Sequence, residues 1–256
     1  HQNPIMSASS GNIIYVGPKG NDIAGSGSLK NPYKTLSKAM EIANDGDAVC
    51  LLNGTYYFND FYINKNITLM GESLENVILD GSGTYRICSI NATDVSIVNL
   101  TFKNGYADAN KRNGGAINSK VGGFLGIYNC AFINNRADTH GGAINIMLNY
   151  ETPSDKLISP VFYVEGSTFE NNTAGMYGGA IHASANSYKD ADNKTLTMNT
   201  TILSSAFIDN TGGREQEHSI SVSAWESAYF DMHDSIIHYT VKEIGIIVCY
   251  RHKYLF

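Results

Sequence analysis

The acidic residues whose spacing suits metal binding form two pairs. Asp45 and Asp47 lie in the segment "NDGDAV", and Asp190 and Asp192 lie in "KDADNKT". Paired carboxylates can hold calcium, but an EF-hand loop also needs a Gly and a distal Glu, which the second pair lacks. A solvated loop is the simpler interpretation, and we expect no bound metal and no cofactor.

Histidines, serines and cysteines that could carry catalysis are present, but no known catalytic pattern includes them. His140 and His182 flank copies of a "GGAI" motif, and neither a G-x-S-x-G nor a C-x-x-C sequence occurs. Cys50, Cys88 and Cys130 lie in apolar runs, which indicates buried free thiols. We therefore predict no catalytic residue, although residues distant in sequence can still meet in space.

The GGAI motif belongs to an internal repeat. "FINNRADTHGGAI" at 132–144 and "FENNTAGMYGGAI" at 169–181 share a Phe, an Asn pair and a GGAI at the same spacing. The aligned Phe residues recur at steps of 30, 37 and 38 residues and are Phe102, Phe132, Phe169 and Phe207. Repeats of this period indicate a solenoid or a related array.

Each aligned column holds one kind of residue. Five residues before each Phe stands a β-branched residue: Ile97, Ile127, Val164 and Ile202. Two and three residues after it stand mainly amides: Asn104, Asn134, Asn135, Asn171, Asn172 and Asn210. The glycine pairs are Gly114, Gly115, Gly141, Gly142, Gly178 and Gly179, and a decayed copy precedes Ile220. A weaker further copy places Met232 and Ile237 in the apolar columns.

A parallel β-helix explains these columns. The β-branched residue and Phe alternate inward along a strand that ends at the Phe. Asn after the strand fits a tight turn because it tolerates the left-handed conformation, and Asn above Asn can form a hydrogen-bonded ladder. Gly-Gly allows a sharp bend or a close approach before the next strand. A helical-hairpin solenoid is excluded because the repeats lack a period of 3.6 and are rich in Asn, Gly and Thr.

The alignment gives no column of bases. Lys103 aligns with Ile133, Glu170 and Ile208, and Arg112 aligns with no other basic residue. The columns of His140 and His182 hold Tyr177 and Asn145 in neighbouring coils, so we expect neither histidine to bind a metal or to act in acid–base catalysis.

Two insertions follow the second and third GGAI copies. They span 147–160 and 184–195, and because they leave the same place in the coil they should emerge on the same side. Tyr150 and Tyr188 within them are the candidates for stacking on sugar rings. Asn193 in the second insertion is the candidate N-glycosylation site among several N-x-S/T sequons.

The segments around the repeats suggest caps. "YKTLSKAMEIA" at 33–43 predicts an amphipathic helix that covers the open end of a solenoid. We predict a disordered segment at 1–12 and a β-helix over 13–240. That β-helix comprises strand plus cap at 13–50, early coils at 51–100 and GGAI repeats at 96–240. Residues 241–256 are a tail or a truncated end.

The F-x-x-N and GGAI motifs resemble the repeats of polymorphic outer membrane proteins and of archaeal adhesin-like surface proteins. The front end, "YVGPKGND" to "NGTY", looks like the opening of right-handed parallel β-helix proteins, which include surface adhesins and polysaccharide lyases. The resemblance covers about residues 13–240, with Gly105 where Asn is expected and a degraded fourth GGAI. It implies an all-β, right-handed single-stranded parallel β-helix (a pectin-lyase-like solenoid) with an N-terminal helical cap.

The resemblance also implies an extracellular location, at the cell surface or envelope, and a binding role. We expect a non-catalytic adhesin-like module for glycans or surface proteins, either as part of a longer chain or as a monomer. The alternatives are a polysaccharide lyase or other carbohydrate-active enzyme, and a structural stalk without a ligand. A net charge of −6 without a basic cluster makes nucleic acid a poor partner, and the apolar runs are too short for membrane insertion.

Overall fold

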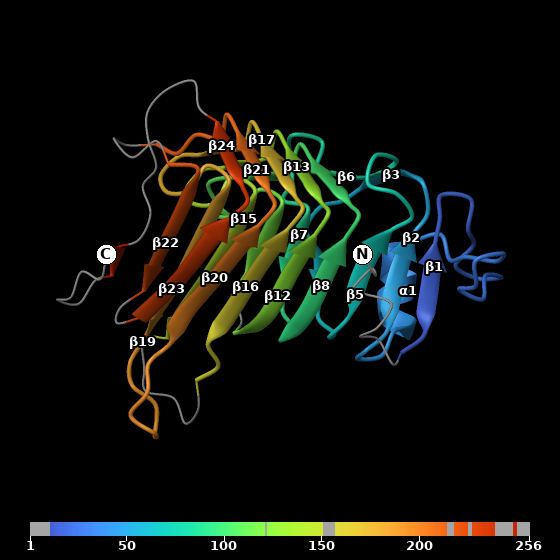
Figure 1. Ribbon diagram of the computed structural model, residues 1–256. Helices are drawn as coiled ribbons and strands as arrows, with labels where there is room; N and C mark the ends of the chain where they lie inside the picture. The colour runs from blue at the N-terminus through green and yellow to red at the C-terminus, as the bar shows by residue number, and fades with distance from the viewer. Residues whose placement is uncertain are drawn as a thin grey trace.

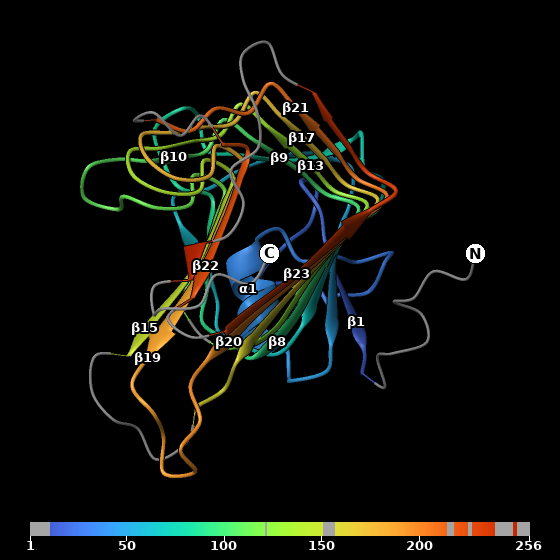
Figure 2. The ribbon, with the colours of Figure 1, turned by 60° about the vertical axis from the view of Figure 1, so that its left-hand side comes forward.

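The computed structural model describes residues 11–120, 122–150, 157–213, 218–224, 227–238 and 248–249. Its strands stack in successive coils into three parallel sheets that wrap around one apolar core (Figures 1 and 2). Most of the predicted segment 1–12 and of the predicted tail 241–256 lies outside the described residues. Among those described, no helix is long and apolar enough to cross a bilayer.

The three long sheets are named in the order in which the chain visits them. The first sheet contains β1 (Ile13–Val16), β2 (Ala48–Leu51), β5 (Thr68–Gly71), β8 (Asp94–Val98), β12 (Gly123–Tyr128), β16 (Pro160–Glu165), β20 (Thr197–Leu203) and β23 (Ser227–His233). The second contains β3 (Gly54–Tyr57), β6 (Val77–Asp80), β9 (Thr101–Lys103), β13 (Ala131–Ile133), β17 (Thr168–Glu170), β21 (Ala206–Ile208) and β24 (Ile236–His238). The third contains β4 (Phe61–Ile63), β7 (Cys88–Ile90), β11 (Ile117–Ser119), β15 (Ile144–Tyr150), β19 (Ile181–Ser187), β22 (Ile220–Ala224) and β25 (Val248–Cys249).

A short sheet of β10 (Tyr106–Ala107), β14 (Arg136–Ala137) and β18 (Thr173–Ala174) lies between the second and third sheets in the GGAI coils. Every paired strand runs parallel to the equivalent strand of the next coil, as in β12 between β8 and β16. This topology is the predicted right-handed parallel β-helix.

The Phe column forms a continuous stack in the core. The rings of Phe102, Phe132, Phe169 and Phe207 are fully buried, with centroids 4.9, 4.7 and 4.7 Å apart and nearly parallel planes. Full burial of one such ring contributes about 1.5–3 kcal/mol. Ile237 continues this column beside Phe207, and Met232 continues the β-branched column beside Ile202, so the weak last copy is confirmed.

The predicted Asn ladder is also present. Asn135, Asn172 and Asn210 are buried, and the side-chain oxygen of each accepts from the backbone N–H of the preceding coil, as in Asn135 N to Asn172 Oδ1 at 3.0 Å. The side-chain amide of Asn172 donates to Asn210 Oδ1 at 2.8 Å and to Phe132 O at 2.9 Å. The ladder therefore satisfies backbone groups that would otherwise be unpaired inside the turn.

The expectation of one strand ending at each Phe is wrong in one respect. The chain turns between the β-branched residue and the Phe, so these two residues lie in the first and second sheets. The turn has one left-handed residue in each repeat coil: Asn99 (φ 54°), Asn129 (φ 49°), Gly166 (φ 60°), Ser204 (φ 49°) and Asp234 (φ 51°). The Asn residues directly after the second sheet are left-handed as predicted, with φ of 56° at Asn134.

The glycine pair is required by geometry at Gly141 and Gly142. Gly141 has a φ of +64°, and a Cβ on Gly142 would lie 2.1 Å from the carbonyl oxygen of Gly179 in the next coil. The loops before the third sheet therefore stack with their backbones in direct contact.

The predicted cap is α1 (Leu36–Ile42), shorter at both ends than the sequence suggested. Thr35 Oγ1 accepts from Lys38 N at 3.2 Å and begins the helix, and Lys65 Nζ donates to Met40 O and Ala43 O at 2.6 Å and closes its end. Leu36 and Met40 join the apolar core, so the helix covers the N-terminal end of the solenoid.

Candidate functional site

The carboxylates considered as metal ligands mainly accept hydrogen bonds from backbone N–H groups. Asp47 is buried and accepts from Asn12 N at 2.9 Å and Asn44 N at 2.8 Å. Asp190 accepts from the N–H groups of Asp192 and Lys194 at 2.9 and 3.0 Å, and these hydrogen bonds lower its pKa. No group of three or more potential ligands lies close enough to hold a metal ion among the described residues.

The described ends of the two insertions lie on the same side, as predicted. The first residues of both insertions extend the strands β15 and β19, which pair as far as Tyr150 and Ser187. The loops therefore begin later in the chain than the sequence suggested. Leu157 N donates to Asp190 Oδ2 at 3.4 Å, which joins the two loops. Tyr188 is 48% exposed after β19, whereas the side chain of Tyr150 lies outside the described residues.

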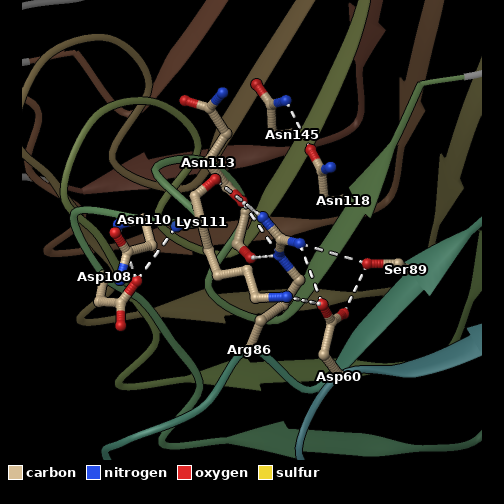
Figure 3. Close-up of polar contacts among 10 residues, drawn as sticks. Asp60, Arg86, Ser89, Asp108, Asn110, Lys111, Asn113, Asn118 and Asn145 are labelled. Carbon is tan, nitrogen blue, oxygen red and sulfur yellow. Dashed lines mark hydrogen bonds and ion pairs between the residues drawn. The ribbon is translucent and has the colours of Figure 1, made fainter.

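A charged cluster that sequence analysis missed lies on the outer side of the third sheet (Figure 3). Asp60, Arg86 and Ser89 come from two successive coils, and all three are buried. Arg86 Nη1 donates to Asp60 Oδ2 at 3.3 Å and to Ser89 Oγ at 3.2 Å, while Ser89 Oγ donates to Asp60 Oδ1 at 2.5 Å. We call these three residues the clamp.

The remaining donors of Arg86 bind the loop of the following coil. Nε donates to the carbonyl oxygens of Asn113 and Gly114 at 3.2 and 3.1 Å, and Nη2 donates to those of Lys111 and Asn113 at 3.1 and 2.7 Å. Burial lowers the pKa of Arg86 and the Asp60 charge raises it in opposition, but a guanidinium remains protonated in either case. All of its N–H groups are therefore used inside the protein, and Arg86 is a structural residue.

Lys111 covers the clamp from the solvent side. Its Nζ lies 3.0 Å from Asp60 Oδ2, and its side chain is 46% exposed. Asp108 accepts from the N–H groups of Asn110 and Lys111 and shapes the loop that carries Lys111. The Asp60 carboxylate thus has a buried cationic partner and a half-exposed one.

A cleft of about 200 Å³ opens beside the clamp. Its lining includes Tyr62, Asn91, Asn118 and Lys120 together with Arg86. Tyr62 is 58% exposed and lies in register with Ser89 on the next coil, which itself lies in register with Asn118. The cleft therefore offers an aromatic ring, two amides and a cation over a floor fixed by the clamp.

The outer column of the third sheet continues beyond the cleft as a hydrogen-bonded row. Asn145 Nδ2 donates to Asn118 Oδ1 at 2.8 Å, and His182 Nδ1 lies 2.7 Å from Asn145 Oδ1. The His182 ring stacks on His140 at 4.5 Å, and His140 stacks on Tyr177 at 5.1 Å. The predicted columns are confirmed, but the contact between the two histidines was not foreseen.

Both histidines are held neutral. Burial, with a smaller effect of the neighbouring His140, lowers the pKa of His182 to about 3. Burial and Arg112 lower the pKa of His140 to about 4. His140 Nδ1 accepts from Tyr177 N at 3.3 Å, which assigns the ring proton to Nε2. These neutral rings extend the polar row as packing and hydrogen-bonding groups.

The sequence contained a pattern that predicts the polar row but not the clamp. Asn118, Asn145 and His182 each follow a GGAI motif, so the repeat itself predicts that they lie side by side. Asp60 and Arg86 lie in coils without the motif and have no counterparts in the repeat, so no pattern could have paired them.

The family of the Chlamydia polymorphic membrane protein repeat matches residues 129–146 and 166–184. These segments contain the turn, Phe, Asn-ladder and GGAI positions described above. The "Metabotropic glutamate receptor-like protein P" of Dictyostelium discoideum is 30% identical over 141 residues, which are 52% of this chain. The match covers 10% of that protein's own length.

Solved structures of carbohydrate-active enzymes are similar to this chain at low identity. Pectate lyase Pel9A aligns with a TM-score of 0.40 and 13% identity over 90% of this chain and 78% of its own. A rhamnogalacturonan lyase aligns with a TM-score of 0.44 and 13% identity, over 92% of this chain and 60% of its own. The GH136 lacto-N-biosidase from Eubacterium ramulus aligns with a TM-score of 0.40 and 10% identity, over 86% of this chain and 56% of its own. At such low scores these likenesses carry no argument about activity.

The repeat match and the coil-by-coil register lead to the same conclusion. The chain is a right-handed parallel β-helix repeat protein that carries repeats of the Chlamydia polymorphic membrane protein type.

Proposed function

We propose that this chain is a non-catalytic, adhesin-like module of a surface protein and that it binds an acidic glycan in the third-sheet cleft. The observation that carries the proposal is the combination of Tyr62, Asn91, Asn118 and Lys120 around one open cleft. An exposed aromatic ring suits the apolar face of a sugar, amides suit its hydroxyl groups, and a cation suits a carboxylate. Lys120 forms no ion pair among the described residues, whereas Lys111 is engaged by Asp60.

The clamp makes the cleft rigid before a ligand binds. Arg86 and Asp60 are buried and hydrogen-bonded on every side, so the backbone that carries Tyr62 and Asn118 is held in place before a ligand arrives. Preorganisation of this kind reduces the entropy lost on binding. A chain of sugars leaving the cleft along the third sheet would reach the loop that carries Tyr188, and we retain Tyr188 and Tyr150 as proposed further contacts.

Binding of oligogalacturonate to purified chain, measured by calorimetry, tests the proposal. We expect Tyr62→Ala and Lys120→Met each to weaken binding about tenfold, equivalent to about 1.4 kcal/mol. The Lys120 variant should also remove most of the salt dependence. The matched controls are Tyr57→Ala, an exposed tyrosine on β3, and Lys103→Met on β9, and neither should change the affinity. Equal affinity for wild type and both cleft variants would contradict the proposal.

The second candidate function is a polysaccharide lyase. Lys120 and Tyr62 line the same cleft, which favours it, because a lysine base and a tyrosine acid could together catalyse elimination from an acidic sugar. Ultraviolet absorbance of unsaturated products, followed in the same samples, distinguishes the two. Product formation that Lys120→Met abolishes would replace the binding proposal with the enzyme, and neither binding nor product would favour a structural stalk.

A further inference from the structure

The outer side of the first sheet carries an aromatic surface built around one glycine. Phe124, Gly126 and Tyr128 point outward from β12, because Leu125 and Ile127 between them are buried in the core. A Cβ on Gly126 would lie 2.8 Å from the Phe124 ring and 2.6 Å from the Tyr128 ring. Both rings therefore lean over the glycine from opposite sides and remain partly exposed.

A third ring extends this surface on the next coil. Tyr163 of β16 lies in register with Gly126, and its ring centroid is 5.6 Å from that of Tyr128. Tyr163 Oη donates to Glu165 Oε2 at 3.4 Å, and Glu165 lies in register with Tyr128. Beyond the rings, Val161 and Tyr229 are 41% and 55% exposed on the same sheet. The rings form a continuous platform bordered by a carboxylate.

Carboxylates border this face. Asp94 lies in register with Phe124 at one end of the platform, and Glu165 borders the other end. Asp231 follows two coils further and lies 3.1 Å from His233 Nδ1. None of the five strands β8, β12, β16, β20 and β23 contains a Lys or an Arg. In contrast, the third-sheet cleft is lined by Arg86 and Lys120.

We propose that this platform is a second saccharide site, separate from the third-sheet cleft, and that it takes an amino sugar with a protonated amine. Neighbouring aromatic rings suit the apolar face of a sugar ring, and ring faces also attract a cation. The carboxylates at both ends select a positive charge and repel an acidic sugar. The partly exposed rings continue to the exposed Val161 and Tyr229 as an apolar patch with a polar border, and large patches of this kind mark interaction sites.

Binding of a glucosamine hexamer and of an N-acetylglucosamine hexamer, compared by calorimetry at about pH 6, tests the site. At this pH an amine is protonated and a glutamate is ionised. We expect the glucosamine hexamer to bind at least tenfold more tightly. Tyr163→Ala should weaken its binding about tenfold, and the isosteric Glu165→Gln should reduce the preference over the acetylated hexamer to about twofold.

Two control variants separate this proposal from the cleft. Tyr57→Ala on β3 and Lys120→Met in the cleft should both leave binding of the glucosamine hexamer unchanged. Equal affinity for the two hexamers, no binding of either, or loss of binding in Lys120→Met would each overturn the proposal. Its failure would leave the oligogalacturonate result untouched, because the two experiments use different probes and different residues.

Discussion

The outer faces of the first and third sheets share one backbone repeat and differ in chemistry. On the third sheet, loops cover the outward side chains, and Ser89, Asn118, Asn145 and His182 are buried and mostly hydrogen-bonded to neighbours. Among the described residues no such row forms on the first sheet, and Tyr163 is partly exposed with one hydrogen bond of 3.4 Å. The third sheet thus uses outward residues for stability and leaves a cleft at its end, whereas the outward rings of the first sheet remain partly accessible to solvent.

The first prediction concerns the clamp and has the largest expected effect. Arg86→Leu should lower the free energy of unfolding by about 3–5 kcal/mol, because it leaves the buried Asp60 carboxylate without its buried partner and frees three loop carbonyls. Urea denaturation followed by circular dichroism measures the change.

Its controls compare the two faces directly. Arg136→Leu removes an arginine that is 60% exposed and lies over the Tyr106 ring, and Tyr163→Ala removes a ring from the first-sheet platform. Arg136→Leu should cost less than about 1 kcal/mol. Tyr163→Ala should cost about 1–2 kcal/mol, because the ring is only partly buried. If Arg86→Leu costs no more than these, the third-sheet face is not the buried, stabilising surface described here.

The second prediction places acid sensitivity on the third-sheet face. The pKa values of His182 and His140, about 3 and about 4, lie below the ordinary value of 6.5, so the unfolded chain binds these protons first. The stability contributed by the neutral rings is full above pH 6.5 and falls as the pH drops towards 4, by about 1.4 kcal/mol per pH unit for each proton.

His182→Asn should reduce this acid sensitivity, because Asn occupies the same column at Asn118 and Asn145. The measurement is the difference between the two proteins in unfolding free energy at about pH 7 and about pH 4.5. The exposed His238→Asn serves as the control. A variant as acid-sensitive as wild type would show that the stacked histidines do not carry the effect.

The third prediction compares two buried hydroxyl groups and has the smallest effect. Thr200 on β20 points into the core beneath the first sheet and is fully buried, and its Oγ1 has no hydrogen-bond partner among the described residues. Thr200→Val should raise the unfolding free energy by about 1 kcal/mol, because it removes an unpaired polar group at constant shape. Ser89→Ala should instead lower it by about 1–2 kcal/mol, since that hydroxyl bonds Asp60 and Arg86. Thermal unfolding of both variants gives the two signs, and equal signs would refute the contrast.

The repeat and most of its interior could be predicted from the sequence. The Phe stack, the Asn ladder, the left-handed Asn after the second sheet and the glycine bend could all be predicted, because each requirement recurs in every coil at the same position. The missed turn at Asn99 and Asn129 also recurs, but Gly166 and Ser204 replace Asn in the later coils and hide the column. The clamp could not be predicted, because Asp60 and Arg86 have no equivalent residues at the same positions of the repeat coils.

The form of the coil can be predicted from the sequence, because stacking repeats one local set of constraints and each repetition strengthens the pattern. The residues that meet on the outer faces become known only from the folded protein. There, a side chain contacts residues in neighbouring coils that do not have to repeat, as Arg86 contacts Asp60 and Lys111, which are 26 and 25 positions away. Close packing limits the residue types at inward positions, whereas the residue type at an outward position depends on its neighbours in the adjacent coils.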